Sequence, residues 1–381
     1  MTLSTLIQFY FILLFALCVV YIITINYLRT GLLKLHCQPG NPVLPSISII
    51  VSMHNEALNA APCIEKLIQL DYPHELFEII LVDDRSTDNT ADILQGYAEK
   101  YSYIQMFSLH KSNPDFAPKK YAIDQAISRA KGEIILLTDA DGRVAADWAR
   151  NMIDCFSDTV GMVIGYAPYS TLPPFDHLSY RLLSLEYLSH AAIAAATTGL
   201  GYPLTCVGTN MAYRKEVYND LNGFGKFKHI HSGDDDLFLQ RVREETDWEI
   251  KYCTHRDSQV INDPPTTWQK FFNQRLRYAS KGFLYPFGVT ISLTFFYFFN
   301  LLLLLSPMTF SIHPVYLIPF IFILGVKGFN DRLFLKTAAE TLNDIRHIRL
   351  FPIAFLLHIP YVVVFGLLGQ FRDFKWGDLK S

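Results

Sequence analysis

Three long stretches of the sequence contain no acidic or basic side chains. Residues 1–28 lack Asp, Glu, Lys, Arg and His altogether, and in residues 282–326 and 350–371 the only such residues are His313 and His358. A helix needs about 20 consecutive apolar residues to cross the hydrocarbon core of a bilayer. With 50% hydrophobic residues overall, the composition excludes an ordinary soluble domain and predicts membrane segments at both ends of the chain.

A cleavable leader is not predicted. Residues 1–28 have neither the basic start nor the small-residue cleavage site of a signal peptide, so we expect a retained anchor. The middle stretch is long enough for two helices, with a break near residues 306–314. The last stretch supplies one more helix, which spans the membrane, re-enters it or lies in its interface. Four apolar segments outside a polar middle make buried core helices the weaker interpretation.

Basic side chains indicate the orientation. Arg29 and Lys34 follow the first apolar segment, and residues 327–349 form a second basic stretch. By the positive-inside rule, both predict that the polar middle is cytoplasmic. We therefore expect an integral membrane protein of a bacterial inner membrane with its polar domain in the cytoplasm. The basic tail after residue 371 conflicts with a complete last span, which would carry it outside.

Two further absences narrow the function. The formal net charge is −3, and no basic excess predicts binding to nucleic acid. The cysteines lack the close paired spacing of a zinc site or a disulfide framework, so we interpret them as reduced thiols. They are Cys18, Cys37, Cys63, Cys155, Cys206 and Cys253.

The polar middle alternates between strand and helix patterns. Short runs rich in β-branched residues predict strands at residues 47–52, 78–82 and 133–138. Helical patterns fill residues 57–70 and 119–132 between them. This alternation predicts an α/β domain with a parallel sheet covered by helices on both faces.

Each predicted strand ends in polar side chains. In open parallel sheets, ligands bind beyond the carboxyl ends of the strands. One acidic strand end is ordinary turn chemistry, whereas three that meet at one edge predict a site for a nucleotide and a metal. The residues at this edge are Ser52, His54, Asn55, Glu56, Asp83, Asp84, Asp139 and Asp141.

Five short motifs follow one another along the polar middle. They read VSMHNEA, VDDRSTDNT, TDADG, SGDDDLFLQRV and QRLRY. In this order they resemble glycosyltransferase family 2, the inverting enzymes with the GT-A fold, among them polysaccharide synthases and ceramide-glucosyltransferase-like enzymes. The resemblance covers about residues 46–282.

The resemblance implies a division of the chain and an activity. Residues 1–35 would be an N-terminal transmembrane anchor, residues 44–282 a cytoplasmic GT-A catalytic domain, and residues 283–381 a membrane region with about three hydrophobic segments. The expected activity is metal-dependent transfer of a hexose from a UDP-sugar to a lipid or polysaccharide acceptor in the bilayer.

The first two motifs would bind the nucleotide. As in the family's Asp-Asp-x-Ser turn, Asp84 would accept a hydrogen bond from uracil N3–H, and Ser52, His54 and Glu56 would line the base and ribose pocket. Lys119, in KKYAID, corresponds to a lysine that lies near the nucleotide in the family. The alternative for the strand-end residues is capping of the following helices.

The TDADG motif would bind Mg²⁺ or Mn²⁺, which prefer carboxylate, phosphate and water oxygens. By resemblance Asp141 is the direct ligand, and Asp139 contacts ribose or metal-bound water. The alternative is an Asp/Gly turn that closes the strand.

The motif with three consecutive aspartates would supply the catalytic base. An inverting transfer needs one carboxylate to remove the proton of the acceptor hydroxyl. The family pattern assigns this role to Asp235, with Asp234 as the second candidate. A structural alternative for one of the three is stabilisation of a helix N-terminus.

The QRLRY motif would reach the diphosphate and the acceptor. Gln274, Arg275 and Arg277 would contact phosphate, for which Arg is well suited, and Tyr278 stands where the family has a Trp beneath the acceptor sugar. Basic and aromatic residues before an apolar segment are also ordinary interfacial anchors.

Two other functions are open at this point. A processive polysaccharide synthase would carry the same motifs but usually has more membrane spans. A GT-A-like nucleotidyltransferase would open with a Gly-rich loop after the first strand, and VSMHNEA contains no glycine.

Overall fold

The computed structural model describes residues 2–35, 43–280, 285–371, 375–376 and 379–380. Within these ranges the cysteines are buried free thiols, as expected for reduced cysteines. Cys37 lies outside the described residues. The free thiols are Cys18, Cys63, Cys155, Cys206 and Cys253.

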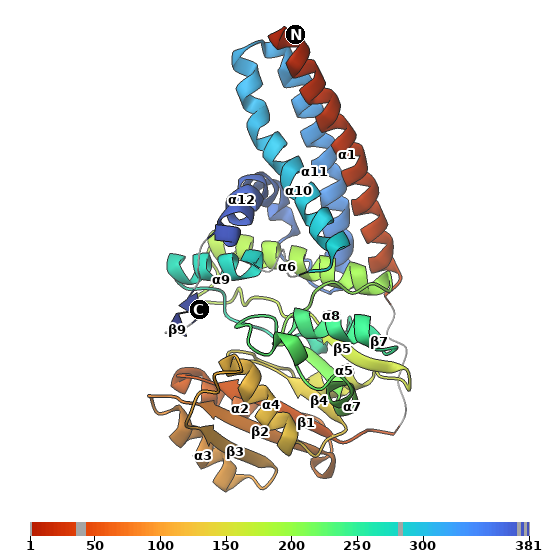
Figure 1. Ribbon diagram of the computed structural model, residues 1–381. Helices are drawn as coiled ribbons and strands as arrows, with labels where there is room; N and C mark the ends of the chain where they lie inside the picture. Colours follow the sequence, from red (N-terminus) through yellow and green to blue (C-terminus); the bar gives the residue numbers. More distant parts are fainter. Residues whose placement is uncertain (1, 36–42, 281–284, 372–374, 377–378, 381) are drawn as a thin grey trace.

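A seven-stranded sheet forms the centre of the polar domain, in the order β3-β2-β1-β4-β6-β5-β7 (Figure 1). The first four strands along the chain are parallel. β6 runs antiparallel to β4 and β5, and β7 is parallel to β5. The predicted α/β class with a mostly parallel sheet is confirmed. The strands are β1 (Ile47–Met53), β2 (Phe77–Asp84), β3 (Ile104–Leu109), β4 (Ile134–Leu137), β5 (Val160–Gly165), β6 (Met211–Arg214) and β7 (Glu249–Cys253).

Apolar clusters lie on both faces of this sheet. Ile49 and Val51 of β1 belong to one cluster, whereas Ile50 packs in the other with Ala122 and Ile123. Burial on both faces explains why the strand sequences are almost continuously apolar. The helices of this domain are α2 (Ala57–Ile68), α3 (Thr90–Lys100), α4 (Pro118–Arg129), α5 (Trp148–Ile153), α7 (Lys215–Asp220) and α8 (Asp236–Glu245).

The register of the central strands brings three polar segments to one edge. Ile47 of β1 pairs with Phe77 of β2 and with Ile134 of β4, in parallel. The carboxyl ends of the three strands therefore lie side by side. The polar residues that follow them are thus close enough in space to form one site.

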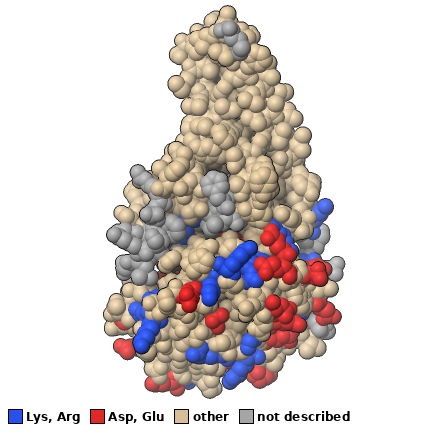
Figure 2. All heavy atoms as spheres, viewed as in Figure 1, with Lys and Arg blue, Asp and Glu red and all other residues tan. Residues whose placement is uncertain are grey.

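Three long helices form a column above the sheet domain (Figure 1). α1 (Leu3–Leu33) packs against α10 (Phe287–Leu305) and α11 (Leu317–Thr341). In Figure 2 the charged side chains gather on the sheet domain and leave the visible face of the column bare. By length and composition, three described segments are able to cross a membrane. They are Leu3–Leu33, Phe287–Ser311 and Ile348–Phe371.

The second half of the middle apolar stretch differs from expectation. Short 3₁₀ turns separate α10 from α11 near the predicted break, but α11 continues to Thr341, far beyond residue 326. The Lys327 ammonium lies 2.5 Å from Asp331 Oδ2, and Tyr21 of α1 donates to Asp331 Oδ1 at 2.6 Å. Because Asp331 neutralises this lysine inside the bundle, α11 continues past residue 327 without a break. The length of the apolar stretch alone therefore underestimates the length of α11.

Three more helices lie across the base of the column, between it and the sheet (Figure 1). We call them the platform. α12 lies along α9, since the Phe365 and Phe271 rings are 5.7 Å apart and Gln370 Nε2 donates to the Ala279 carbonyl at 2.7 Å. Among the arrangements considered for the last apolar segment, this packing favours the interfacial one over a span parallel to the column. The platform helices are α6 (Leu178–Gly199), α9 (Trp268–Ser280) and α12 (Phe351–Phe371).

α1 and α6 cross in direct backbone contact. A Cβ added at Gly199 would lie 2.0 Å from the Gly31 carbonyl oxygen, and one added at Gly31 would lie 2.0 Å from the Ala196 oxygen. Small residues allow helix backbones to approach this closely. The crossing therefore requires glycine on both helices.

Replacing Gly199 by Leu should separate α1 from α6, because no space for a side chain exists there. We expect destabilisation of about 1–3 kcal/mol, the usual cost of overpacking, or more. Thermal unfolding in detergent measures it. Gly325→Leu on α11 is the matched control, since a Cβ there meets nothing within 4 Å. Equal melting temperatures for both variants and the unmodified chain would contradict the crossing.

A reporter fused after Phe371 should lie on the same side of the membrane as the sheet domain. The reason is that α12 is one of the platform helices and does not run along the column. Paired green-fluorescent and alkaline-phosphatase fusions in cells would report the side. The same reporters at Ile312, between α10 and α11, should give the opposite result. Agreement between the two positions would overturn this topology.

Candidate active site

One ammonium group joins three segments at the sheet edge. Lys119, in the first turn of α4, lies 2.7 Å from Asp139 Oδ1 after β4 and 3.0 Å from Asp234 Oδ2 before α8. Burial lowers the pKa of Lys119, but the two carboxylates outweigh it and raise the pKa above its ordinary value. The lysine is therefore a fixed positive charge that draws two predicted motifs together.

More negative charge surrounds this lysine than it neutralises. Burial, together with the charges of Asp139 and Glu56, raises the pKa of Asp141 to about 7. Burial also raises the pKa of Glu56, although a hydrogen bond from Asn59 and the charge of Lys270 oppose the shift. Lys270 stands in the first turn of α9, so the acidic edge faces the platform.

The carboxylates alone do not make a complete metal site. Among the described residues, no group of three or more His, Cys, Asp or Glu side chains has the arrangement that holds a metal ion. Mg²⁺ is commonly bound through one or two carboxylates plus substrate phosphates. The mutual repulsion at Asp141 and Asp139 fits such a shared site, to which phosphate oxygens would contribute the remaining ligands.

The three consecutive aspartates have three different surroundings. Asp234 pairs with Lys119, and Asp236 accepts a 2.6 Å hydrogen bond from Tyr285; these aspartates are 7% and 1% exposed. Asp235 is half-buried. Its Oδ1 accepts from the Asp236 N–H at 2.7 Å at the start of α8, and its Oδ2 accepts from the Gly208 N–H at 3.2 Å. Asp235 is thus the most accessible of the three.

The ends of β1 and β2 are braced against each other. His54 Nδ1 lies 2.6 Å from the Asp84 carbonyl oxygen, and the Ser86 N–H donates to Asp83 at 3.2 Å. The Asp84 carboxylate is buried and pairs with Arg85 at 2.7 Å. Ser52, at the end of β1, is half-buried. These residues lie at the edge where the base pocket is predicted.

The QRLRY residues lie on α9 and do not all face one way. Arg275 is buried in an ion pair, 2.5 Å from Glu186 of α6. Its Nη1 also donates to Gln274 Oε1 at 2.8 Å. Arg277 and Tyr278 are half-buried, with the guanidinium 5.3 Å from the ring centre. Within the described part of the chain, Arg275 and Gln274 form hydrogen bonds with Glu186 of α6 and with Tyr169, and none with the acidic edge.

The profile described as Glycosyl transferase family 2 matches residues 48–221. This segment contains the strand ends, Lys119 and the TDADG motif. The chain carries a glycosyltransferase family 2 domain. The prediction of a family 2 domain is confirmed, and the matched segment begins within β1.

Curated relatives match this chain over part of its length. The probable glycosyltransferase YdaM of Bacillus subtilis (strain 168) is 25% identical over 245 residues, which are 62% of this chain and 55% of that protein. A beta-monoglucosyldiacylglycerol synthase of Nostoc sp. (strain PCC 7120) is 35% identical over 121 residues, 32% of this chain and 25% of that protein. The chain spans about half the length of the first relative and less of the second.

A solved structure extends the likeness to the whole chain. The mannosyltransferase PcManGT from Pyrobaculum calidifontis, in complex with GDP-Man and Mn²⁺, has a TM-score of 0.58 with 17% identity. The comparison covers 97% of this chain and 99% of that one. At this identity the likeness establishes the fold, and the predicted GT-A architecture is confirmed.

Glu186 connects the three platform helices, and sequence reasoning missed it. Besides Arg275, its carboxylate contacts His190 Nε2 at 2.8 Å and accepts from Tyr361 of α12 at 2.9 Å. Burial raises the pKa of Glu186, but the charges of Arg275 and His190 outweigh it and lower the pKa to about 2. The only sequence signal was an acidic residue inside an otherwise apolar helical stretch.

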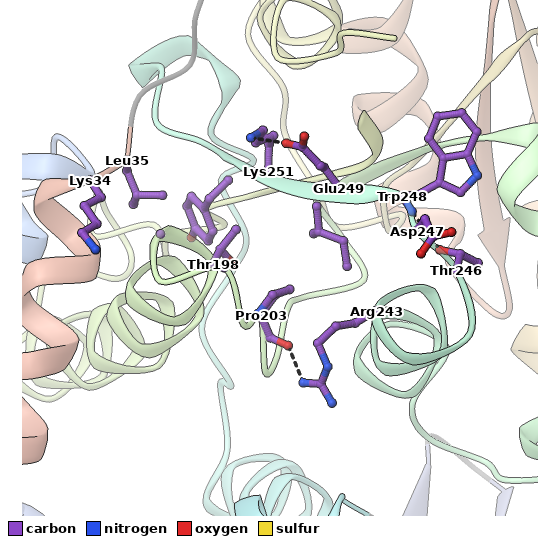
Figure 3. Close-up of a pocket in the computed structure, with 14 residues that line it drawn as sticks. Lys34, Leu35, Thr198, Pro203, Arg243, Thr246, Asp247, Trp248, Glu249 and Lys251 are labelled. Carbon is purple, nitrogen blue, oxygen red and sulfur yellow. Dashed lines mark hydrogen bonds and ion pairs between the residues drawn. The ribbon is translucent and has the colours of Figure 1, made fainter. Parts of the chain in front are cut away.

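A cavity lies away from this chemistry. It has a volume of about 460 Å³ and is lined by the ends of α1, α6 and α8 and by β7 (Figure 3). Arg243, which donates to the Pro203 carbonyl there, is about 12 Å along α8 from Asp235 at 1.5 Å per residue. The lysine–glutamate pair in Figure 3 is Lys251–Glu249. This cavity is not the active site.

Removing either member of the Glu186–Arg275 pair should destabilise the protein strongly, because the other charge stays buried without its partner. We expect a loss of about 3–5 kcal/mol for Glu186→Leu or Arg275→Met, and less than the sum for the double variant. Thermal unfolding in detergent provides the double-mutant cycle. The exposed pair Lys336–Glu340 is the control, and additive effects at Glu186 and Arg275 would contradict the coupling.

Proposed function

We propose that this chain is a membrane-embedded inverting glycosyltransferase that transfers a sugar from a UDP-sugar to a lipid acceptor, with Mg²⁺ or Mn²⁺. The observation that carries the proposal is the acidic edge around Lys119, which faces the platform at the base of an apolar column. The family 2 domain supports glycosyl transfer, and the apolar segments support the bilayer as the location.

The donor would bind across the carboxyl ends of the strands. Asp84, Ser52, His54 and Glu56 would receive the nucleoside. A divalent ion held by Asp141, with Asp139 beside it, would neutralise the charge that develops on the departing diphosphate. Lys119 would keep the strand end and the three-aspartate loop at a fixed separation.

Asp235 would be the catalytic base. In an inverting transfer, the acceptor hydroxyl loses its proton while it attacks the sugar carbon from the face opposite the leaving group. Asp235 suits this role because two backbone N–H groups orient its carboxylate and because it is more exposed than its neighbours. Asp234, the second candidate, is engaged by Lys119.

A lipid acceptor is supported by the exposed aromatic side chains beside the platform. Trp268 at the start of α9 is 79% exposed and Phe287 at the start of α10 is 81% exposed. Aromatic side chains at this level are typical of the membrane–water interface. The relative from Nostoc is named for the synthesis of a glucosylated diacylglycerol. Gln274, Arg277 and Tyr278 would guide the acceptor headgroup, with Arg275 holding α9 in place.

The detergent-solubilised protein should release UDP from one UDP-sugar in the presence of Mg²⁺ or Mn²⁺ and extracted membrane lipids. Asp141→Ala should abolish the metal-dependent release. Asp235→Asn should lower kcat by about 10²–10⁴-fold, because the base is lost. Asp220→Ala, on the exposed end of α7, is the control and should keep full activity.

Metal-independent UDP release that persists in Asp141→Ala would overturn the role given to TDADG. Counting sugars per acceptor separates the two acceptor classes. One sugar, or a small fixed number, indicates a lipid glycosyltransferase, whereas a distribution of long chains indicates a processive polysaccharide synthase.

A further inference from the structure

Two arginines without partners lie where α6, α11 and α12 meet. The 3₁₀ turn η6 (Ile348–Leu350) contacts all three helices at this point. Arg181 is in the first turn of α6, and Arg349 is in η6, just before the first residue of α12. Both residues are exposed. Among the described residues, neither guanidinium forms an ion pair or a hydrogen bond.

A third arginine and a histidine lie beside them. Arg346 Nη1 and His347 Nε2 are 3.3 Å and 3.2 Å from the hydroxyl oxygen of Thr171. Arg346 also pairs with Asp344 through two contacts of 2.7 Å and 2.9 Å, so one carboxylate neutralises one of the three arginines. We call this group the basic corner. It consists of Thr171, Arg181, Arg346, His347 and Arg349.

The pKa of His347 reflects the excess of positive charge. Burial lowers this pKa below its ordinary value, and the charges of Arg346 and Arg181 lower it further. Asp344 acts in the opposite direction and is outweighed. Arg181, which belongs to a different segment of the chain, is therefore within electrostatic reach of His347.

The backbone adds charge of the same sign. α6 and α12 both begin at this corner, and neither has an acidic residue in its first turn. The N-terminus of a helix carries a partial positive charge, which repels a basic side chain. The stability of the two helices therefore gives no reason for arginines at these positions. An anion between them would remove the repulsion.

Exposed apolar side chains flank both arginines. Leu178, which is 53% exposed, precedes Arg181 by three positions on α6, and Ile353, which is 44% exposed, follows Arg349 by four. Residues at these spacings lie on the same face of a helix. Each arginine thus has an apolar neighbour at the base of the column. Such a combination is typical of helices that lie in the membrane interface.

We propose that the basic corner binds the phosphate of an anionic phospholipid, in the leaflet on the side of the sheet domain. This site rests on the membrane location in the proposed function, and not on the donor sugar or the catalytic base. Arg181 and Arg349 would donate to the phosphate oxygens, and the acyl chains would lie along Leu178 and Ile353. A zwitterionic lipid would be attracted less, because its own cationic group cancels the phosphate charge.

The test is displacement of radiolabelled phosphatidylglycerol from the full chain in detergent. Unlabelled phosphatidylglycerol should displace the label at a concentration about 30-fold lower than phosphatidylcholine does, since each basic side chain contributes roughly a factor of five. In Arg181→Gln/Arg349→Gln the ratio should fall to about 3-fold or less, because both uncompensated charges are gone. Neither arginine has a partner, so this variant should melt at the same temperature as the unmodified protein.

Three control variants accompany this one. Arg181→Lys/Arg349→Lys keeps both charges and should keep most of the preference. Arg129→Gln/Lys131→Gln removes two exposed charges at the far end of α4 and should leave the ratio unchanged. Tyr278→Ala should also leave it unchanged. Loss of the preference in Tyr278→Ala would mean that the label occupies the predicted acceptor site, and would overturn the inference.

The failures are distinguishable. Inorganic phosphate that displaces the label as well as phosphatidylglycerol does would show an anion site without a lipid. Equal displacement by both lipids, or a folded Arg181→Gln/Arg349→Gln variant with the full ratio, overturns the basic corner while metal-dependent UDP release still supports the proposed function. The proposed function fails by a separate result, when no UDP-sugar is cleaved or when the chain is not recovered with membranes.

Discussion

The ammonium of Lys119 is the contact on which the site depends. It lies between Asp139 and Asp234, which belong to segments with separate positions in the chain. Without it, the end of β4 and the loop before α8 would carry like charges toward each other. With it, Asp139 and Asp234 share one positive charge, while the charges of Asp139 and Glu56 still repel that of Asp141. The site is thus stable as a scaffold and still attractive to a cation.

The division of labour among the three aspartates follows from this contact. Asp234 is bound to the lysine and Asp236 to the Tyr285 hydroxyl, so each is buried with a partner. Asp235 is half-buried, and two backbone N–H groups orient its carboxylate. A run of three carboxylates is therefore not redundant, because each has a different electrostatic environment.

Two kinds of contact fix the platform against the column and hold its helices together. At Gly31 and Gly199 the backbones of α1 and α6 touch, which leaves no freedom to slide. At Glu186 a carboxylate joins α6 to Arg275 of α9 and Tyr361 of α12. The platform, which includes the QRLRY helix α9, is thereby held together and tied to the column.

The central strands β1, β2 and β4, the sheet edge and the family 2 domain followed from the sequence alone, because β-branched runs, helix periodicity and motif order are local properties. The other four strands of the sheet were not predicted. The sequence also singled out Lys119 and the acidic residues that the structure brings together at the sheet edge. It did not predict the partner of Lys119, the role of Glu186 or the burial of Arg275. It also did not predict that α11 continues beyond Lys327, and it left the position of α12 open. These features depend on charges that neutralise one another across distant segments and on which helix faces become buried. Only the tertiary structure decides those pairings.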